Sequence, residues 1–215
     1  MSKPRLHIGD KNYSSWSMRP WLALRVGKVA FEEVLHALPE MGGGKPAFGA
    51  ISPNARVPAL ELDGVVVAES LAICEWAAEQ NPALWPKNAN ERALARSAAS
   101  IMHSGFPNLR NDAPMNIRRR TDAGRMTPAG LDDAAKVDEL WSDWLRRSGG
   151  PFLFGDYSVA DAMYAPVVTR FVTYAIPRSA AAQGYIDRMV AEPHMAAWIA
   201  AAEKETRTLP RSDIA

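Results

Sequence analysis

The sequence contains a single cysteine, Cys74, among 215 residues. One thiol excludes a disulfide within the chain and a metal site built from several thiolates. The four histidines, His7, His36, His103 and His194, are scattered without the short spacing of zinc ligands. We therefore expect no bound metal, and a chain without disulfides is typical of the reducing cytoplasm.

A strong net charge and long apolar runs are missing as well. The formal net charge is +1, which speaks against a polyanion as the main partner. The run Arg118-Arg119-Arg120 is a local exception, and without a wider basic surface we interpret it as a solvated helix end or loop. No apolar run reaches the roughly 18 residues that span a membrane, and the N-terminus lacks the apolar core of a signal peptide. We expect neither nucleic acid nor a membrane as a partner.

Motifs of two large enzyme classes are also absent. No GxSxG segment is present, so nothing supports an α/β-hydrolase. The segment GGGKP, residues 42–46, is similar to a phosphate-binding loop but lacks its first glycine at the required spacing. Proline also stands where that loop needs serine or threonine. With no dinucleotide fingerprint either, nucleotide binding is not expected.

The residues that are present predict a mixed N-terminal region. Apolar residues make up 47% of the chain and charged residues 23%, which is typical of a globular protein. The pattern of the first 80 residues is β-α-β-loop-β-β-α, with expected elements at 5–9, 17–27, within 29–38, at 57–62, 65–67 and 71–80. The pair Asp63-Gly64 predicts the hairpin turn. Apolar residues on both faces of the second strand predict a sheet covered on two sides.

The rest of the chain predicts helices only. Residues 81–93 are rich in proline and asparagine and are interpreted as a linker. Beyond them, apolar residues at spacings of three and four predict an all-helical region over residues 94–215. Ser158 and Asp161 have the spacing of a capping box, so we interpret them as a helix start and not as a catalytic pair.

Two short motifs in the N-terminal region can bind a ligand. Val57-Pro58 begins a predicted strand, either as an ordinary trans peptide or as a cis bond that presents the Val57 backbone to an extended peptide. Glu69-Ser70 lies at a predicted helix start. There Ser70 is either an N-cap or a ligand of a carboxylate, and Glu69 can receive an ammonium group.

In these segments the chain resembles the cytosolic glutathione S-transferase family. The resemblance covers nearly the whole chain and is carried by SSWSMRPWLAL, SPNARVPALELDGVVVAESLAICEWAAE, LWP and FLFGDYSVADAMYAPVVTRF. It implies an α/β thioredoxin-like N-terminal domain (residues 1–80), the linker, and an all-α C-terminal domain (residues 94–215). It also implies a homodimer and a cis bond at Val57-Pro58.

The resemblance implies glutathione as co-substrate and assigns residues to it. The Val57 backbone would pair with the cysteinyl unit, while Glu69 and Ser70 would hold the γ-glutamyl end. Lys45 or Arg56 would meet the glycyl carboxylate.

The catalytic hydroxyl would come from the segment SSWS. Ser14 falls at the catalytic position of serine-type members, with Ser15 beside it. SSW resembles the SSC of zeta-class maleylacetoacetate isomerases, with Trp16 in place of the cysteine. A site without cysteine speaks against thiol transfer through a protein mixed disulfide. Pro20 favours a helix that starts near Ser17, whereas the resemblance places the start near Ser15.

The electrophile would lie between the two domains. The candidate residues for lining this electrophile site are Trp16, Met102, His103, Phe106 and Arg170. For the apolar ones, ordinary core packing is the better interpretation. Arg170 lies in an apolar helix, where a charge needs a partner, and we expect it to bind an acidic substrate or to close an ion pair.

Three functions remain, in order of preference. The first is a glutathione transferase that conjugates the thiol to small electrophiles. The second is a glutathione-dependent isomerase of the maleylacetoacetate type. The third is a glutathione-binding module with little turnover.

Overall fold

The N-terminal part of the molecule is built on a four-stranded mixed sheet. The computed structural model describes residues 2–40, 44–210 and 212–213. The strands are β1 (Arg5–Gly9), β2 (Glu32–His36), β3 (Ala59–Leu62) and β4 (Val65–Ala68), in the order β2-β1-β3-β4. β1 is parallel to β2 and antiparallel to β3, and β3 and β4 form the predicted hairpin. This is the thioredoxin-like arrangement that the sequence predicted.

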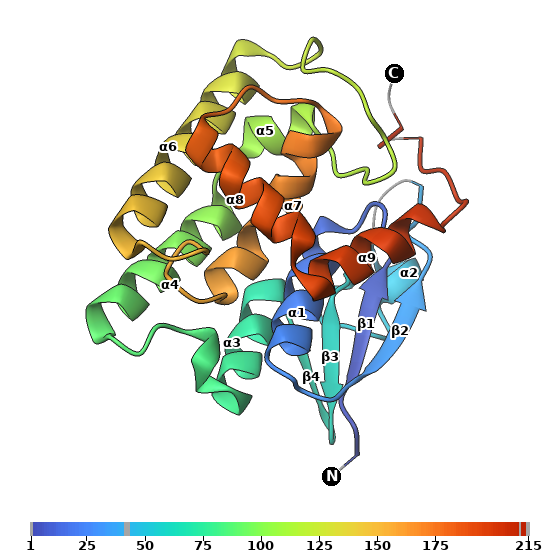
Figure 1. The fold of residues 1–215 in the computed structure, drawn as a ribbon. Coiled ribbons are helices and arrows are strands. Elements are labelled where there is room, and N and C mark those ends of the chain that lie inside the picture. The colour runs from blue at the N-terminus through green and yellow to red at the C-terminus, as the bar shows by residue number, and fades with distance from the viewer. Residues whose placement is uncertain (1, 41–43, 211, 214–215) are drawn as a thin grey trace.

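Helices make up the rest of the described chain, with a short 3-10 turn at Pro82–Leu84. They are α1 (Ser15–Val26), α2 (Lys45–Phe48), α3 (Ser70–Gln80), α4 (Ala89–Ser104), α5 (Pro107–Asp112), α6 (Pro128–Ser148), α7 (Val159–Thr173), α8 (Ala180–Ala191) and α9 (Pro193–Glu203). Helices α1 and α3 cover one face of the sheet and face the helical part (Figure 1). None of the described helices is long and apolar enough to cross a membrane. Helix α4 begins inside the expected linker, and the domain boundaries themselves stay a prediction.

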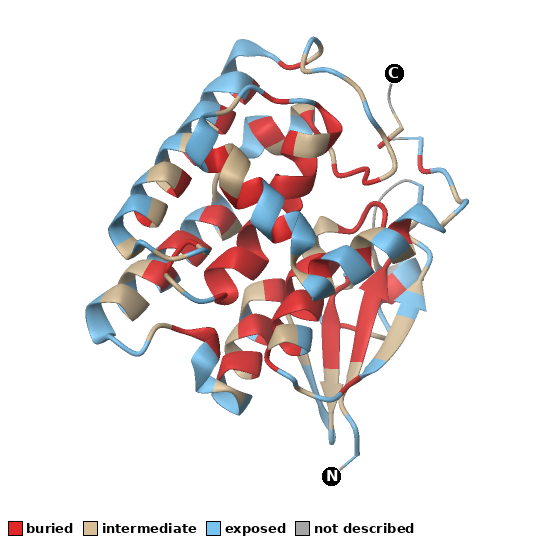
Figure 2. Cartoon of the chain, in the orientation of Figure 1, coloured by how far each residue is buried: buried red, intermediate tan, exposed pale blue. Residues whose placement is uncertain are grey.

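Helix α7 is the centre of the helical part. Apolar side chains surround it on all sides, and 14 of its residues are buried, which is the pattern of a helix enclosed by others. Its neighbours include α1 and α4, so one apolar core runs from the sheet into the helices. Figure 2 shows this continuous buried zone between α1, α3 and α7.

The capping box at the start of α7 is confirmed. Ser158 accepts from the Asp161 backbone amide, and the amide of Ser158 donates to Asp161 Oδ2 at 2.9 Å. The other carboxylate oxygen accepts from the Leu153 amide and the Tyr185 hydroxyl, each at 3.0 Å. Burial raises the pKa of Asp161 to about 6, so at neutral pH the carboxylate accepts from all these donors. One side chain therefore ties the loop before α7 and helix α8 to the start of α7.

One expectation about local structure was wrong, and two alternatives that the sequence left open are now decided. Strand β2 is an edge strand with Leu35 53% exposed, so its two faces are not both covered. Helix α1 begins at Ser15 and encloses Pro20, which is buried; packing between the sheet and α7 outweighs the lost backbone hydrogen bond. The N-cap of α3 is Glu69, so the side chain of Ser70 is not the cap.

We expect Asp161→Asn to lower the free energy of unfolding by about 2–3 kcal/mol, because the new amide group would face buried donors that lose their acceptor. Urea denaturation at neutral pH measures it. Asp156→Asn is the matched control, since Asp156 is exposed in the same loop. Equal midpoints for the two variants would contradict the role given to Asp161.

Candidate active site

A pocket of about 230 Å³ lies where the N-terminal part meets α4. Its walls come from α1, the turn before β3, the start of α3 and α4. The lining residues are Trp16, Asn54, Arg56, Val57, Pro58, Glu69 and His103. All except Asn54 belong to the site expected from the sequence. Segments far apart in the chain therefore converge on one cavity.

The peptide bond between Val57 and Pro58 is cis. Strand β3 begins only at Ala59, so Val57 stands before the strand ladder and beside the pocket. An extended peptide can therefore pair with its backbone without competing with the sheet.

Glu69 lines the pocket, and Ser70 follows it as the buried first residue of α3. Glu69 has a φ of +80°, an uncommon backbone conformation for a residue with a side chain and one that clusters at ligand sites. Its carboxylate accepts from Asn54 Nδ2 at 3.4 Å and lies 3.7 Å from His103 Nε2. The Ser70 hydroxyl is buried and has no hydrogen-bond partner among the described residues. Together with the amides at the start of α3, it leaves a place for an anionic acceptor.

Trp16 lines the pocket on the α1 side, and two arginine side chains lie over its ring. Its ring meets His103 edge-on, with 5.4 Å between the centroids. The guanidinium carbons of Arg19 and Arg110 lie 4.1 and 4.9 Å from the centroid of the Trp16 ring. Burial lowers the pKa of Arg19 and of Arg110, and the neighbouring Arg170 lowers that of Arg19 further. These cations make the region behind Trp16 strongly positive.

The three arginines donate to backbone carbonyls. Arg110 donates to the His103 carbonyl at 2.9 Å, near the end of α4. Arg19 donates to Met163 at 3.0 Å and Arg170 to Ala113 at 2.8 Å. Among the described residues none of the three arginines forms a salt bridge, so the ion pair expected as one role of Arg170 is not formed.

The serines at the start of α1 have different surroundings. Ser14 is the N-cap residue of α1, although its side chain makes no cap hydrogen bond. Its hydroxyl donates to Ser17 Oγ at 2.7 Å, and the Gly9 amide donates to the same Ser17 oxygen at 3.1 Å. Ser14 is buried and Ser15 is half-buried. With Ser17 inside the helix, Ser14 and Ser15 are left near the positive end of the α1 dipole.

Comparison with known proteins identifies the family of this chain. Residues 13–80 match the family profile of the glutathione S-transferase N-terminal domain. A maleylpyruvate isomerase of Ralstonia sp is 35% identical over 178 residues, which cover 74% of this chain and 80% of that protein. The chain belongs to the cytosolic glutathione S-transferase family. It is an enzyme of that family, as the sequence predicted.

Other relatives agree with this assignment. Maleylacetoacetate isomerase of Rattus norvegicus is 28% identical over 182 residues, which cover 82% of each chain. The crystal structure of a glutathione transferase homologue from Burkholderia gl BGR1, with bound glutathione, has a TM-score of 0.73 to this chain. It is 24% identical and covers 95% of this chain and 100% of that one. The thioredoxin-like plus helical fold of the glutathione S-transferases is thereby confirmed.

Some of the expected site residues lie elsewhere in this transferase. Met102 and Phe106 are buried in the apolar core and do not line the pocket. Arg170 is buried on α7 behind the wall. Lys45 begins α2, and its side chain lies outside the described part. In the described chain, no group of three or more His, Cys, Asp or Glu side chains is placed to hold a metal ion.

The only cysteine takes no part in this site. Cys74 lies inside α3 and is fully buried. Burial raises the pKa of its thiol far above the ordinary value, so the thiol stays protonated and unreactive. A nucleophilic sulfur in this enzyme must therefore come from a bound thiol.

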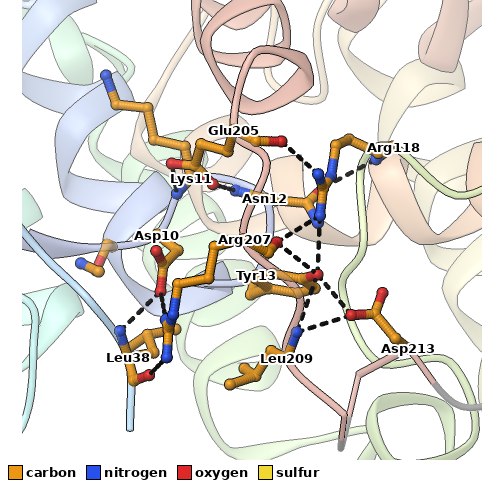
Figure 3. A network of polar contacts seen from close by, with 12 residues as sticks. Asp10, Lys11, Asn12, Tyr13, Leu38, Arg118, Glu205, Arg207, Leu209 and Asp213 are labelled. Carbon is orange, nitrogen blue, oxygen red and sulfur yellow. Dashed lines mark hydrogen bonds and ion pairs between the residues drawn. The ribbon is translucent and has the colours of Figure 1, made fainter. Parts of the chain in front are cut away.

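Polar contacts that no sequence pattern indicated hold residues 10–13, the loop before Ser14. The Asp10 carboxylate accepts from the Leu38 amide at 2.7 Å and pairs with Arg207 at 2.6 Å. Tyr13 donates to Asp213 at 2.7 Å, and Glu205 accepts from the Asn12 amide at 2.9 Å. Figure 3 shows how the C-terminal segment, with Glu205, Arg207 and Asp213, converges on residues 10–13. Such contacts join residues nearly the whole chain apart, which no local pattern reveals.

Proposed function

We propose that this enzyme is a glutathione transferase that activates the thiol of glutathione for attack on small electrophiles. The Ser70 hydroxyl carries the proposal: it is buried beside Glu69 and has no hydrogen-bond partner in the part of the chain that the structure describes. Glutathione has an α-carboxylate and an α-ammonium group at one end, and this pair of side chains complements both. In this proposal the Val57 backbone pairs with the cysteinyl unit, and Arg56, which lines the same pocket, binds the glycyl carboxylate.

Ser14 is the proposed donor to the sulfur. A free thiol has a pKa of about 8.5 and is mostly protonated at neutral pH. Each unit by which the pKa falls requires roughly 1.4 kcal/mol of preferential thiolate stabilisation. A hydrogen bond to a charged group contributes about 1.5–3 kcal/mol, so one hydroxyl, helped by the α1 dipole, supplies one or two units. No general base is needed.

An isomerase acting on an acidic substrate is the second candidate. The curated relatives from Ralstonia sp and Rattus norvegicus are named maleylpyruvate and maleylacetoacetate isomerases. The positive cluster of Arg19, Arg110 and Arg170 behind Trp16 supports an anionic electrophile in this enzyme, because buried cations without carboxylate partners favour a bound anion.

We expect Ser70→Ala to weaken glutathione binding by about 1.5–3 kcal/mol, or roughly 10- to 100-fold in Kd. Because the hydroxyl has no partner among the described residues, the free energy of unfolding should stay unchanged or rise. Calorimetric titration and urea denaturation measure the two effects. Ser97→Ala, at an exposed serine of α4, is the matched control. Unchanged glutathione affinity in Ser70→Ala would remove Ser70 from the site.

We expect Ser14→Ala to lower kcat at least tenfold with little change in glutathione affinity, and Ser15→Ala to have the smaller effect. Steady-state rates on aryl halides, peroxides and maleylacetoacetate measure it and separate the transferase from the isomerase. An enzyme that fails to bind glutathione contradicts both functions. Binding without turnover on any substrate would leave only the binding module.

Arg170→Ala should reduce kcat/KM for maleylacetoacetate at least tenfold more than for an aryl halide. The ratio of the two values in one preparation cancels any loss of folded enzyme, which matters because Arg170 also holds the Ala113 carbonyl. An unchanged ratio would reject a role for Arg170 in binding the acidic substrate.

A cytoplasmic homodimer is part of the same proposal. The family resemblance implies the dimer, and the edge strand β4 supports it, with Val65 57% and Val66 39% exposed. Apolar side chains on an edge strand are normally covered. Light scattering should give twice the mass of the chain, and a monomer at micromolar concentration would contradict the dimer.

A further inference from the structure

We propose that Ser17 is a positioning residue that turns the Ser14 hydroxyl toward the thiol of glutathione. The inference rests on the proposed function, because it concerns the same sulfur. It assigns a role in the reaction to a side chain that lies inside α1 and does not line the pocket.

The argument begins with the number of protons and lone pairs. A serine hydroxyl has one proton to donate and two lone pairs to accept with. The Gly9 amide can only donate, so its bond to Ser17 Oγ at 3.1 Å occupies one lone pair permanently. The Ser17 hydroxyl keeps its proton and its second lone pair, so toward Ser14 Oγ, 2.7 Å away, it can either accept a hydrogen bond or donate one.

A bound thiolate reverses the direction of one hydrogen bond. With an empty pocket, Ser14 donates to Ser17. When Ser14 donates to sulfur, its oxygen needs a donor in turn, and Ser17 supplies it. The two O–H bonds rotate and no heavy atom moves. The resulting chain runs from the Gly9 amide through Ser17 and Ser14 to the sulfur, and each bond polarises the next.

The protein is built so that this chain forms. Ser14 and Ser17 are three residues apart at the start of α1, a spacing that places side chains on one face of a helix. Gly9 ends β1, and a side-chain carbon there would lie 2.6 Å from Leu38 Cδ2 and 3.2 Å from Ser14 Cβ. Glycine therefore lets the end of the strand approach the helix closely enough for its amide to reach Ser17.

Burial keeps the chain free of competing water. Ser17 has no exposed surface and Ser14 is 6% exposed. The Asp10 carbonyl accepts from the Ser14 amide at 2.8 Å, and the Asp10 carboxylate is paired with Arg207. Neither of these contacts involves Ser17, so a substitution there leaves them in place.

The test measures the thiol pKa of glutathione in the binary complex, from the ultraviolet absorbance of the thiolate against pH. Wild type is compared with Ser14→Ala, Ser17→Ala and the double variant. We expect Ser17→Ala to raise the thiol pKa by about half a unit to one unit, less than Ser14→Ala, with glutathione Kd within twofold of wild type. The double variant should match Ser14→Ala, because Ser17 acts through Ser14.

Two further variants separate positioning from mere structural support. Ser158→Ala removes a buried serine hydroxyl at the start of α7, so it should destabilise the protein without changing the thiol pKa. Ser17→Cys has nearly the same volume and a weaker donor; it should raise the thiol pKa in the same direction and keeps the test decisive if Ser17→Ala does not fold.

The outcomes distinguish the two proposals. A wild-type thiol pKa in Ser17→Ala and Ser17→Cys, with a raised value in Ser14→Ala, overturns the role of Ser17 alone. Additive shifts in the double variant overturn it too, since Ser17 would then act independently. An unchanged thiol pKa in Ser14→Ala removes Ser14 as the donor, and the role of Ser17 with it.

Discussion

The burial of α1 between the sheet, α3 and α7 is the constraint on which the active site depends. It joins the thioredoxin-like part to the helices through one continuous core. It also outweighs the cost of Pro20 inside the helix, so that α1 can begin at Ser15. If the helix began at Ser17 instead, Ser14 and Ser15 would lie in the preceding loop. Because packing sets the start of α1, it also decides that the Ser14 and Ser15 hydroxyls lie at the N-terminus of the helix and that Ser17 lies inside it.

The pocket combines two electrostatic environments. At the start of α3, the Ser70 hydroxyl has no partner among the described residues, and the Glu69 carboxylate lines the pocket. Together they complement a ligand end that carries both a carboxylate and an ammonium group. Behind Trp16, three buried arginines are held by backbone carbonyls and not by carboxylates. Hydrogen bonds to carbonyls fix a guanidinium without neutralising it, so the wall stays positive. One pocket can thus bind a zwitterionic thiol compound and still favour an acidic partner for it.

Most of the fold was predictable because its signals are local. Asp63-Gly64 marks the hairpin and Ser158 with Asp161 marks the start of α7, and both are as expected. The prediction for β2 was wrong because an edge position is a property of the sheet and leaves no mark in a short apolar run. In the site, Val57 and Glu69 were found from motifs. Arg19 and Arg110 were not. Arg19 lies one helical turn from Trp16 on α1, but only the tertiary structure brings Arg110 of α5 to the same ring.

The sequence by itself determined which chemical groups this protein can use. It supplies serines near a helix start, a Val-Pro step and a Glu-Ser pair, each made of residues adjacent in the chain. Only the tertiary structure decided which of these groups form hydrogen bonds within the protein and which stay available to a ligand. Ser17 lies inside α1 and accepts from the Gly9 amide, and the C-terminal segment contacts the loop before Ser14. Within the described part of the chain, the Ser70 hydroxyl has no hydrogen-bond partner. Hydrogen-bond partners and burial depend on contacts between distant segments, and these exist only once the chain has folded.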